Sequence, residues 1–266
     1  NINLNSIRND TVLLGGSFAQ TQSNYKGYID DFTLFDKSLN NTDINTVYNS
    51  YNEINKLPLN EWSHVTVNYD KIQKESTIAI NGINIGKYEN YDAVINNNNS
   101  NIVFGNGFTG ELGEVAIFER PLSTNEINYL ATDLNRHLTQ NVIFETSFKQ
   151  MSNTHMMDET NNSYHAIMNN SSTYGVGHTT NSTALYFDGS QTATLPYNSK
   201  CNSFNQMMFN CVFKHNNTSI AHIIKKDGVF KLFIDVNGKI KLDIYDNSDS
   251  YNTYTSSTNL VEANVF

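Results

Sequence analysis

A stretch at residues 27–47 reads Gly-Tyr-Ile-Asp-Asp-Phe-Thr-Leu-Phe-Asp-Lys-Ser-Leu-Asn-Asn-Thr-Asp-Ile-Asn-Thr-Val. It returns in related form at residues 110–130, as Gly-Glu-Leu-Gly-Glu-Val-Ala-Ile-Phe-Glu-Arg-Pro-Leu-Ser-Thr-Asn-Glu-Ile-Asn-Tyr-Leu. The two align without a gap, which places Gly27 on Gly110 and Phe35 on Phe118. An internal repeat of this kind defines a unit of architecture, so the rest of the chain is best interpreted around it.

Each copy predicts a strand followed by a short helix. The runs 29–35 and 112–118 are largely apolar, which is typical of strands. Polar residues with helix-capping spacing follow each run, and a capping box marks the first turn of a helix. The two capping pairs are Asn40 with Asp43 and Ser123 with Glu126.

The segment between the two copies contains a clear hairpin. From Trp62 the chain alternates, with His64, Thr66 and Asn68 on one face and Val65, Val67 and Tyr69 on the other. Two further strands, 77–80 and 83–88, meet at Asn81-Gly82. This dipeptide favours a type I′ turn, in which both central residues have positive φ.

After residue 141 the chain again consists of short strands with glycine turns, and we predict a second type I′ hairpin at Asn237-Gly238. Helix is expected only after the repeat strands. The prediction is therefore an all-β fold, a β-sandwich or jelly roll, with one or two short helices after the closing strands.

Composition excludes two classes of partner. The 266 residues have a net charge of −9 and no cluster of Lys or Arg, which argues against binding a nucleic-acid backbone. No apolar run approaches the length of about 20 residues that a membrane span needs. Because residue 1 is Asn and not Met, we expect a processed product or a fragment.

The two cysteines, Cys201 and Cys211, leave two interpretations open. They are close enough in sequence for a disulfide. Because the chain has only two cysteines, it is equally possible that they are unpaired thiols in the core.

At this point the sequence resembles the laminin-G-like, concanavalin A-like lectin/glucanase jelly-roll family. The family's closing signature is matched at 27–44 and more loosely at 110–127, where Gly113 and Glu114 replace an Asp pair. Its central signature, Trp-x-His-Val followed by a hairpin, is matched from Trp62 to Gly82. Its early signature is matched at 144–148, Asp158 and 185–189.

The order of these pieces differs from that of the family. We predict that residues 1–50 are the C-terminal part of one unit, that 51–138 are the central and C-terminal part of a second, and that 139–266 are the N-terminal part of another. The alternative is that 55–266 form one circularly permuted jelly roll. Half a sandwich would leave an apolar face and open strand edges in water, which is the physical argument for this alternative.

The sequence shows no catalytic carboxylate pair. Glycoside hydrolases need two carboxylates on one face, about 5 to 9.5 Å apart. Acidic residues near one another in sequence, such as Glu111 and Glu114 or Asp243 and Asp246, are three positions apart and do not share a strand face. His64 is best explained as a strand residue beside a core Trp. We therefore expect a protein that is not an enzyme.

The resemblance also implies calcium as a candidate cofactor, because such folds often bind it through loop carboxylates. The oxygen ligands to test are those of Asp30, Asp31, Asp158 and Asp188. The competing interpretation gives these carboxylates structural roles in turns, by hydrogen bonds to backbone N–H groups.

The expected function is that of a non-enzymatic adhesion or assembly module of a larger repetitive protein, located outside the cell, on a cell surface or on a virion. Its expected partners are glycans or other surface proteins, including copies of itself. Two alternatives stay open: a structural part of a particle or filament without a glycan ligand, and a glycoside hydrolase whose carboxylates come together from separate strands.

Overall fold

The computed structural model divides the chain into two units, residues 1–50 and 51–266. The residues that it describes are 35, 38–41, 43–44, 57–89, 98–132, 138–179, 181–201, 206–216, 219–245 and 251–255. In the first unit, the backbone N–H of Asp43 donates to Asn40 Oδ1 at 2.8 Å and that of Ile44 donates to the Asn40 carbonyl at 2.9 Å. The predicted helical turn after the first repeat strand is thus confirmed at its cap.

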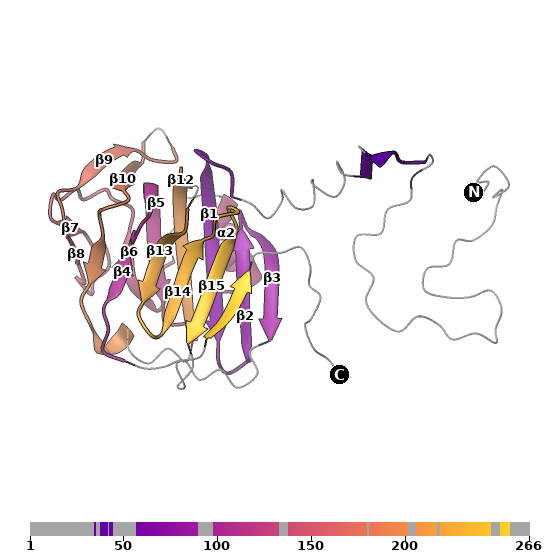
Figure 1. The fold of residues 1–266 in the computed structure, drawn as a ribbon. Coiled ribbons are helices and arrows are strands. Elements are labelled where there is room, and N and C mark those ends of the chain that lie inside the picture. The colour runs from indigo at the N-terminus through magenta and orange to yellow at the C-terminus, as the bar shows by residue number, and fades with distance from the viewer. Residues whose placement is uncertain are drawn as a thin grey trace. The chain divides into compact units, whose positions relative to one another are not determined.

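The second unit is a β-sandwich, with two layers of strands facing each other in Figure 1. The elements are β1 (Trp62–Asp70), β2 (Glu75–Ile80), β3 (Ile83–Glu89), β4 (Ile102–Phe104), β5 (Thr109–Phe118), α2 (Thr124–Thr132), β6 (Val142–Thr146), β7 (His155–Met156), β8 (Ala166–Met168), β9 (Thr173–Val176), β10 (Thr183–Asp188), β11 (Ala193–Leu195), a 3₁₀ turn η2 (Ser199–Cys201), β12 (Gln206–His215), β13 (Ala221–Lys226), β14 (Phe230–Ile234), β15 (Ile240–Tyr245) and β16 (Tyr251–Thr255).

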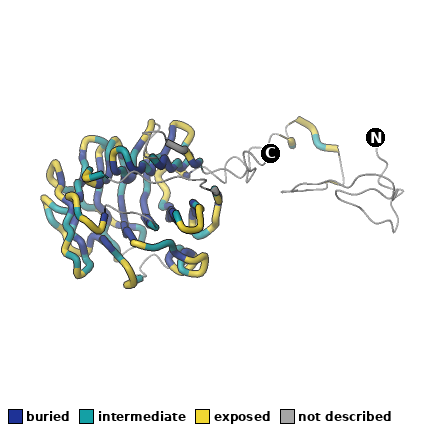
Figure 2. Tube along the Cα trace, turned by 90° about the horizontal axis from the view of Figure 1, so that it is seen from below, coloured by how far each residue is buried: buried dark blue, intermediate teal, exposed yellow. Residues whose placement is uncertain are grey.

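Both sheets are antiparallel. The first has the order β3-β2-β1-β12-β5-β10-β9, with β6 also paired to β5. The second has the order β16-β15-β14-β13-β4-β11-β8-β7. Apolar side chains from both sheets form the central core, and Figure 2 shows the strands as mostly buried, with the exposed residues concentrated in the connections. The all-β prediction is confirmed.

Both sheets combine strands from residues 51–138 with strands from residues 139–266. In the first sheet β12 lies between β1 and β5 and pairs with each of them. In the second, β4 lies between β11 and β13. The described part of residues 57–255 thus forms one sandwich with a shared core. Circular permutation as the origin of this strand order stays a prediction.

One predicted hairpin turn is confirmed and the other is wrong in type. Asn81 and Gly82 have φ of 50° and 81°, as a type I′ turn requires. At the second hairpin only Gly238 has positive φ, 74°, and Asn237 does not. The carboxylate of Asp235 explains the difference, because its Oδ1 accepts from the N–H groups of Asn237 and Lys239 and favours a wider turn closed by Gly238.

Helix α2 covers part of the outer face of the first sheet. The predicted capping box is present: Ser123 N–H donates to Glu126 Oε2 at 2.9 Å, and Glu126 N–H points back to Ser123 Oγ at 3.4 Å. The helix buries Ile127 and Leu130 in a second, smaller apolar cluster. Other members of that cluster come from the sheet beneath: Ala79, Ala116, Phe118 and Met208.

The two cysteines are both free thiols and both buried, so the core interpretation holds in this structure. Burial raises the pKa of the Cys201 thiol to about 11 and raises that of Cys211 as well. Both are therefore protonated at neutral pH and act as small apolar groups in the core.

Candidate functional site

A row of side chains crosses the outer face of the first sheet at one end of β1. Trp62 is directly opposite Lys214 on β12, which is opposite Glu111 on β5, which is opposite Tyr186 on β10. Residues paired in this way point to the same face of a sheet. Their neighbours along the strands, such as Phe213, point into the core. The four side chains together are called the aromatic row below.

Contacts within the aromatic row hold its centre in place. Lys214 Nζ lies 2.7 Å from Glu111 Oε2 and 5.3 Å from the centre of the Trp62 ring. The Trp62 ring also meets His178 edge-on, with ring centres 6.0 Å apart. All four side chains of the row are partly exposed, including 30% of Lys214 and 22% of Glu111. The row thus offers preorganised aromatic and polar groups to solvent.

Strand geometry sets the length of the row. Neighbouring strands lie about 4.8 Å apart, so Trp62 and Tyr186, separated by three such steps, are about 14 Å apart at the backbone. Two aromatic rings at this separation with an ion pair between them form a long and shallow surface. Such a surface suits an extended ligand that has both apolar and hydrogen-bonding edges.

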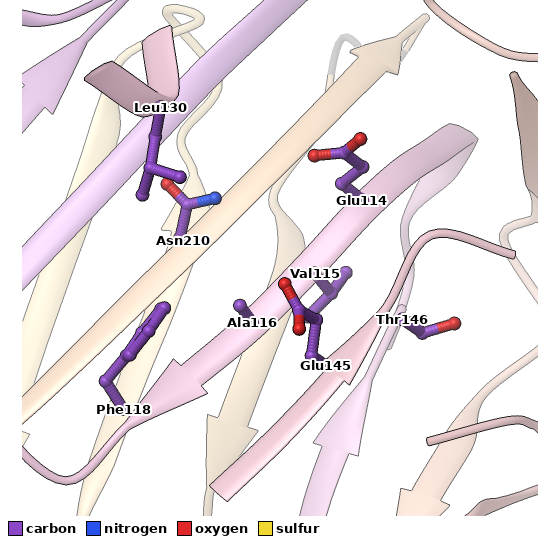
Figure 3. Close-up of a pocket in the computed structure, with 8 residues that line it drawn as sticks. All are labelled: Glu114, Val115, Ala116, Phe118, Leu130, Glu145, Thr146 and Asn210. Carbon is purple, nitrogen blue, oxygen red and sulfur yellow. The ribbon is translucent and has the colours of Figure 1, made fainter. Parts of the chain in front are cut away.

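A pocket with two carboxylates lies further along the same face. Glu114 comes from β5, and Glu145 comes from β6, where it is opposite Ala116. Figure 3 shows both carboxylates projecting from these neighbouring strands, with Asn210 of β12 and Leu130 of α2 on the other side of the pocket. Folding has therefore placed two acidic side chains from separate strands on one face.

The volume of this pocket limits what it can hold. It amounts to about 10 Å³, close to the smallest space that accommodates one water molecule. Glycoside hydrolysis requires a sugar ring, and in inverting enzymes a water as well, between the two carboxylates. The pocket in this form has room for a water and not for a sugar.

A buried histidine lies next to the pocket. His64 Nε2 is 2.6 Å from Asn210 Oδ1, which also accepts a hydrogen bond from the Thr66 hydroxyl at 3.1 Å. Because an amide oxygen only accepts, Nε2 carries the proton. Burial lowers the pKa of His64 to about 4, against the smaller opposing effect of its hydrogen bond with Asn210. His64 is therefore neutral at pH 7.

We expect the low pKa of His64 to make stability fall as the pH drops from about 6.5 to 4. In the unfolded chain its pKa is about 6.5, so over this range the unfolded state binds a proton that the folded state does not, and the loss reaches about 3 kcal/mol. Below about pH 4 both states are protonated and this loss stops growing. Urea unfolding at pH 7, 5.5 and 4 measures it. His64→Gln should flatten the dependence, and an unchanged slope would contradict this origin.

Comparison with known families supports the fold. Residues 46–128 match the family model described as the concanavalin A-like lectin/glucanases superfamily. The described residues of 57–255 form an antiparallel β-sandwich, which is consistent with the fold of that superfamily. The matched segment includes β1, β2, β3, β4 and β5 and most of α2. No curated protein and no solved structure matches the chain. The superfamily includes enzymes and non-enzymes, so the match by itself assigns no activity.

The resemblance to concanavalin A-like folds implied calcium as a candidate cofactor. Asp158 does not fit the role of a calcium ligand in this structure. Its Oδ1 accepts from the N–H groups of Glu145 and Thr160. Its Oδ2 accepts from the Thr160 hydroxyl and the N–H of Tyr164. Four hydrogen bonds occupy the acceptor sites of the carboxylate, which is 4% exposed. Asp158 therefore holds the loop after β7 against β6.

Asp188 is at the exposed turn that follows β10. Its Oδ1 accepts from the hydroxyl and the N–H of Ser190 and from the N–H of Gln191. These hydrogen bonds, the one from the Ser190 hydroxyl foremost, lower the pKa of Asp188. Asp30 and Asp31 lie outside the described residues. Within the described part of the chain no three His, Cys, Asp or Glu residues are grouped as a metal site, and calcium binding stays a prediction.

The aromatic row was not predicted as a unit from the sequence. The expectation that Glu111 and Glu114 lie on opposite faces is wrong, because the register shift between Val212 and Phe213 brings both onto the outer face of β5. The sequence did contain one signal for the row. Trp62, Lys214 and Tyr186 have polar or amphipathic side chains, whereas the neighbouring positions in their strands are taken by core residues. The register between β1, β12, β5 and β10 was needed to show that they lie side by side.

Proposed function

We propose that this concanavalin A-like sandwich is a non-enzymatic binding module, and that it serves adhesion or assembly in a larger extracellular, cell-surface or virion-surface protein. The proposed ligand is an extended glycan bound along the aromatic row. The observation that supports this most is the alignment of Trp62, Lys214, Glu111 and Tyr186 in one exposed row.

The chemistry of the row matches that of a sugar chain. Each pyranose has an apolar C–H face that can lie on an aromatic ring, and hydroxyl groups at its edge that can bond to Lys214 and Glu111. The rings of Trp and Tyr bury large areas with few rotatable bonds, so binding restricts little side-chain freedom. Within the described residues no helix is long and apolar enough to cross a membrane.

A glycan array with the wild-type protein and two variants tests the proposal. Tyr186→Ala and Trp62→Ala should each lower affinity for the bound glycans about tenfold or more, as is typical of aromatic residues central to an interface. The matched control is Tyr129→Ala on α2, where the tyrosine is 44% exposed and away from the row. Equal binding by all four proteins, or no glycan bound by any, would contradict the proposal.

The hydrolase alternative has one observation in its favour, the placement of Glu114 and Glu145 on one face. A hydrolysis screen on oligosaccharides, with Glu114→Gln and Glu145→Gln as variants, separates the two functions. The binding module should release no reducing sugar. Turnover that either variant abolishes would replace the proposed function with catalysis.

A further inference from the structure

Strand β5 carries one extra residue opposite β12, and that residue is Gly113. Val212 of β12 lies opposite Glu114, and the next residue of β12 lies opposite Leu112, so the register shifts between these two pairs. A β-bulge of this kind re-aims the side chains of the strand that contains it. Glu111 and Glu114 therefore share the outer face of the sheet, although they are three positions apart in the sequence.

The bulge at Gly113 leaves room for the indole ring of Trp62. A Cβ built on Gly113 would lie 3.1 Å from Cζ3 and 3.5 Å from Cη2 of that ring, and 3.0 Å from Nδ1 of His178. Carbon atoms in favourable contact are about 3.5 to 4.0 Å apart, so no side chain fits at this position unless its neighbours move. Trp62 lies on β1, which is separated from β5 by β12, and its ring therefore extends over β12 to reach Gly113.

Two further side chains hold the Trp62 ring. His178, in the connection between β9 and β10, meets it edge-on with ring centres 6.0 Å apart, and the His178 side chain is 1% exposed. His178 Nε2 also lies 3.9 Å from Glu114 Oε1. Lys214 Nζ lies 5.3 Å from the centre of the Trp62 ring. Gly113, His178 and Lys214 are called the Trp62 seat below, because together they determine where the ring lies.

The first repeat copy has a different residue at the position of Gly113. Asp30 aligns with Gly113, and Asp31 aligns with Glu114. A carboxylate at the position of Gly113 would overlap with the Trp62 ring, because even its first carbon atom lies too close. The difference between aspartate in one copy and glycine in the other thus coincides with the space that Trp62 needs.

We propose that Gly113 is a positioning residue of the aromatic row. Its bulge turns Glu111 to the outer face, where Glu111 pairs with Lys214, and its lack of a side chain lets the Trp62 ring reach β5. The proposal rests on the proposed function, because it names what sets the orientation of a residue assigned to binding. A ring that is fixed before the ligand arrives lowers the entropic cost of binding.

Fluorescence tests the Trp62 seat, because Trp62 is the only tryptophan of the chain. The full chain is compared as wild type, as Gly113→Asp, which introduces the residue of the first copy, and as Gly113→Ala. The matched control is Gly175→Ala on edge strand β9, where the nearest atom to a new Cβ is 3.8 Å away. The emission maximum and acrylamide quenching report on the exposure of the ring, and urea unfolding verifies that each variant is folded.

Gly113→Asp should increase acrylamide quenching of Trp62 about twofold and shift its emission to longer wavelength, because the added group pushes the ring away from β5. Gly113→Ala should change both in the same direction but by less, since the Cβ alone is a smaller group. Gly175→Ala should match the wild type. Wild-type quenching and emission in folded Gly113→Asp, or in Gly113→Ala where Gly113→Asp does not fold, would overturn the proposal.

The glycan array separates this proposal from the proposed function. Gly113→Asp should lower the affinity for the bound glycans about tenfold, as expected for Trp62→Ala, whereas Gly175→Ala should leave it unchanged. Changed fluorescence with unchanged glycan affinity would also overturn the positioning role. If the wild type binds no glycan and Gly113→Asp still changes the fluorescence, the proposed function fails and the Trp62 seat is supported.

Discussion

Replacement of Gly110 by alanine is expected to lower the free energy of unfolding by about 3 to 5 kcal/mol. Gly110 has a φ of 151°, and a Cβ built on it would lie 2.2 Å from the backbone oxygen of Lys214 and 2.9 Å from the Cα of His215. Neither neighbour can rotate away, because both contact atoms belong to the backbone of β12. The added methyl group must force β5 and β12 apart next to the aromatic row.

Urea unfolding of Gly110→Ala measures this loss, with Gly175→Ala as the control. Gly175 lies on edge strand β9, where the nearest atom to a new Cβ is Glu111 Oε1 at an ordinary 3.8 Å. The control should change stability by less than about 1 kcal/mol. If Gly110→Ala were as stable as the control, the close approach of β5 to β12 would be wrong. Gly110 is also the first residue of the second repeat copy, and this contact supplies a reason for glycine there.

Substitution of Asn68 by alanine is expected to cost about 2 to 4 kcal/mol, because it leaves two buried backbone groups without partners. Asn68 Nδ2 donates to the Leu122 carbonyl, and Asn68 Oδ1 accepts from the Leu122 N–H. The side chain thereby fixes the connection that leads into α2.

Thermal and urea unfolding measure the effect of Asn68→Ala. Asn125→Ala is the matched control, because Asn125 is exposed on α2. Asn68→Asp makes the test sharper: it keeps the acceptor for the Leu122 N–H but places a carboxylate oxygen against the Leu122 carbonyl, so it should also be destabilised. A fully stable Asn68→Ala would show that the connection is held by other contacts.

Several parts of the fold could be predicted because their causes are local. The Asn81-Gly82 turn needs two residues that tolerate positive φ, and the dipeptide itself contains them. The capping box of Ser123 and Glu126 depends on residues three positions apart. The second hairpin was predicted with the wrong turn because Asp235, just outside the dipeptide, binds the turn's N–H groups.

For β1, the sequence predicted which residues share a face but not what surrounds each face. Alternation correctly separated His64, Thr66 and Asn68 from the apolar face. It did not show what covers the polar face, and all three residues are buried, His64 at 2% and Asn68 at 8% exposure. Their partners are Asn210, far along the chain, and the Leu122 backbone. The alternation of side chains along a strand shows which residues share a face. It does not show what covers that face.

The sequence by itself determined the class of the molecule: a β-sandwich built from strands whose turns and helix caps are encoded within a few residues of one another. Only the tertiary structure decided which residues meet on its outer surface. The aromatic row and the carboxylate pocket each depend on strands distant in sequence, above all on β12 entering between β1 and β5. That pairing depends on the burial of a shared core, a collective effect that no short stretch of sequence contains.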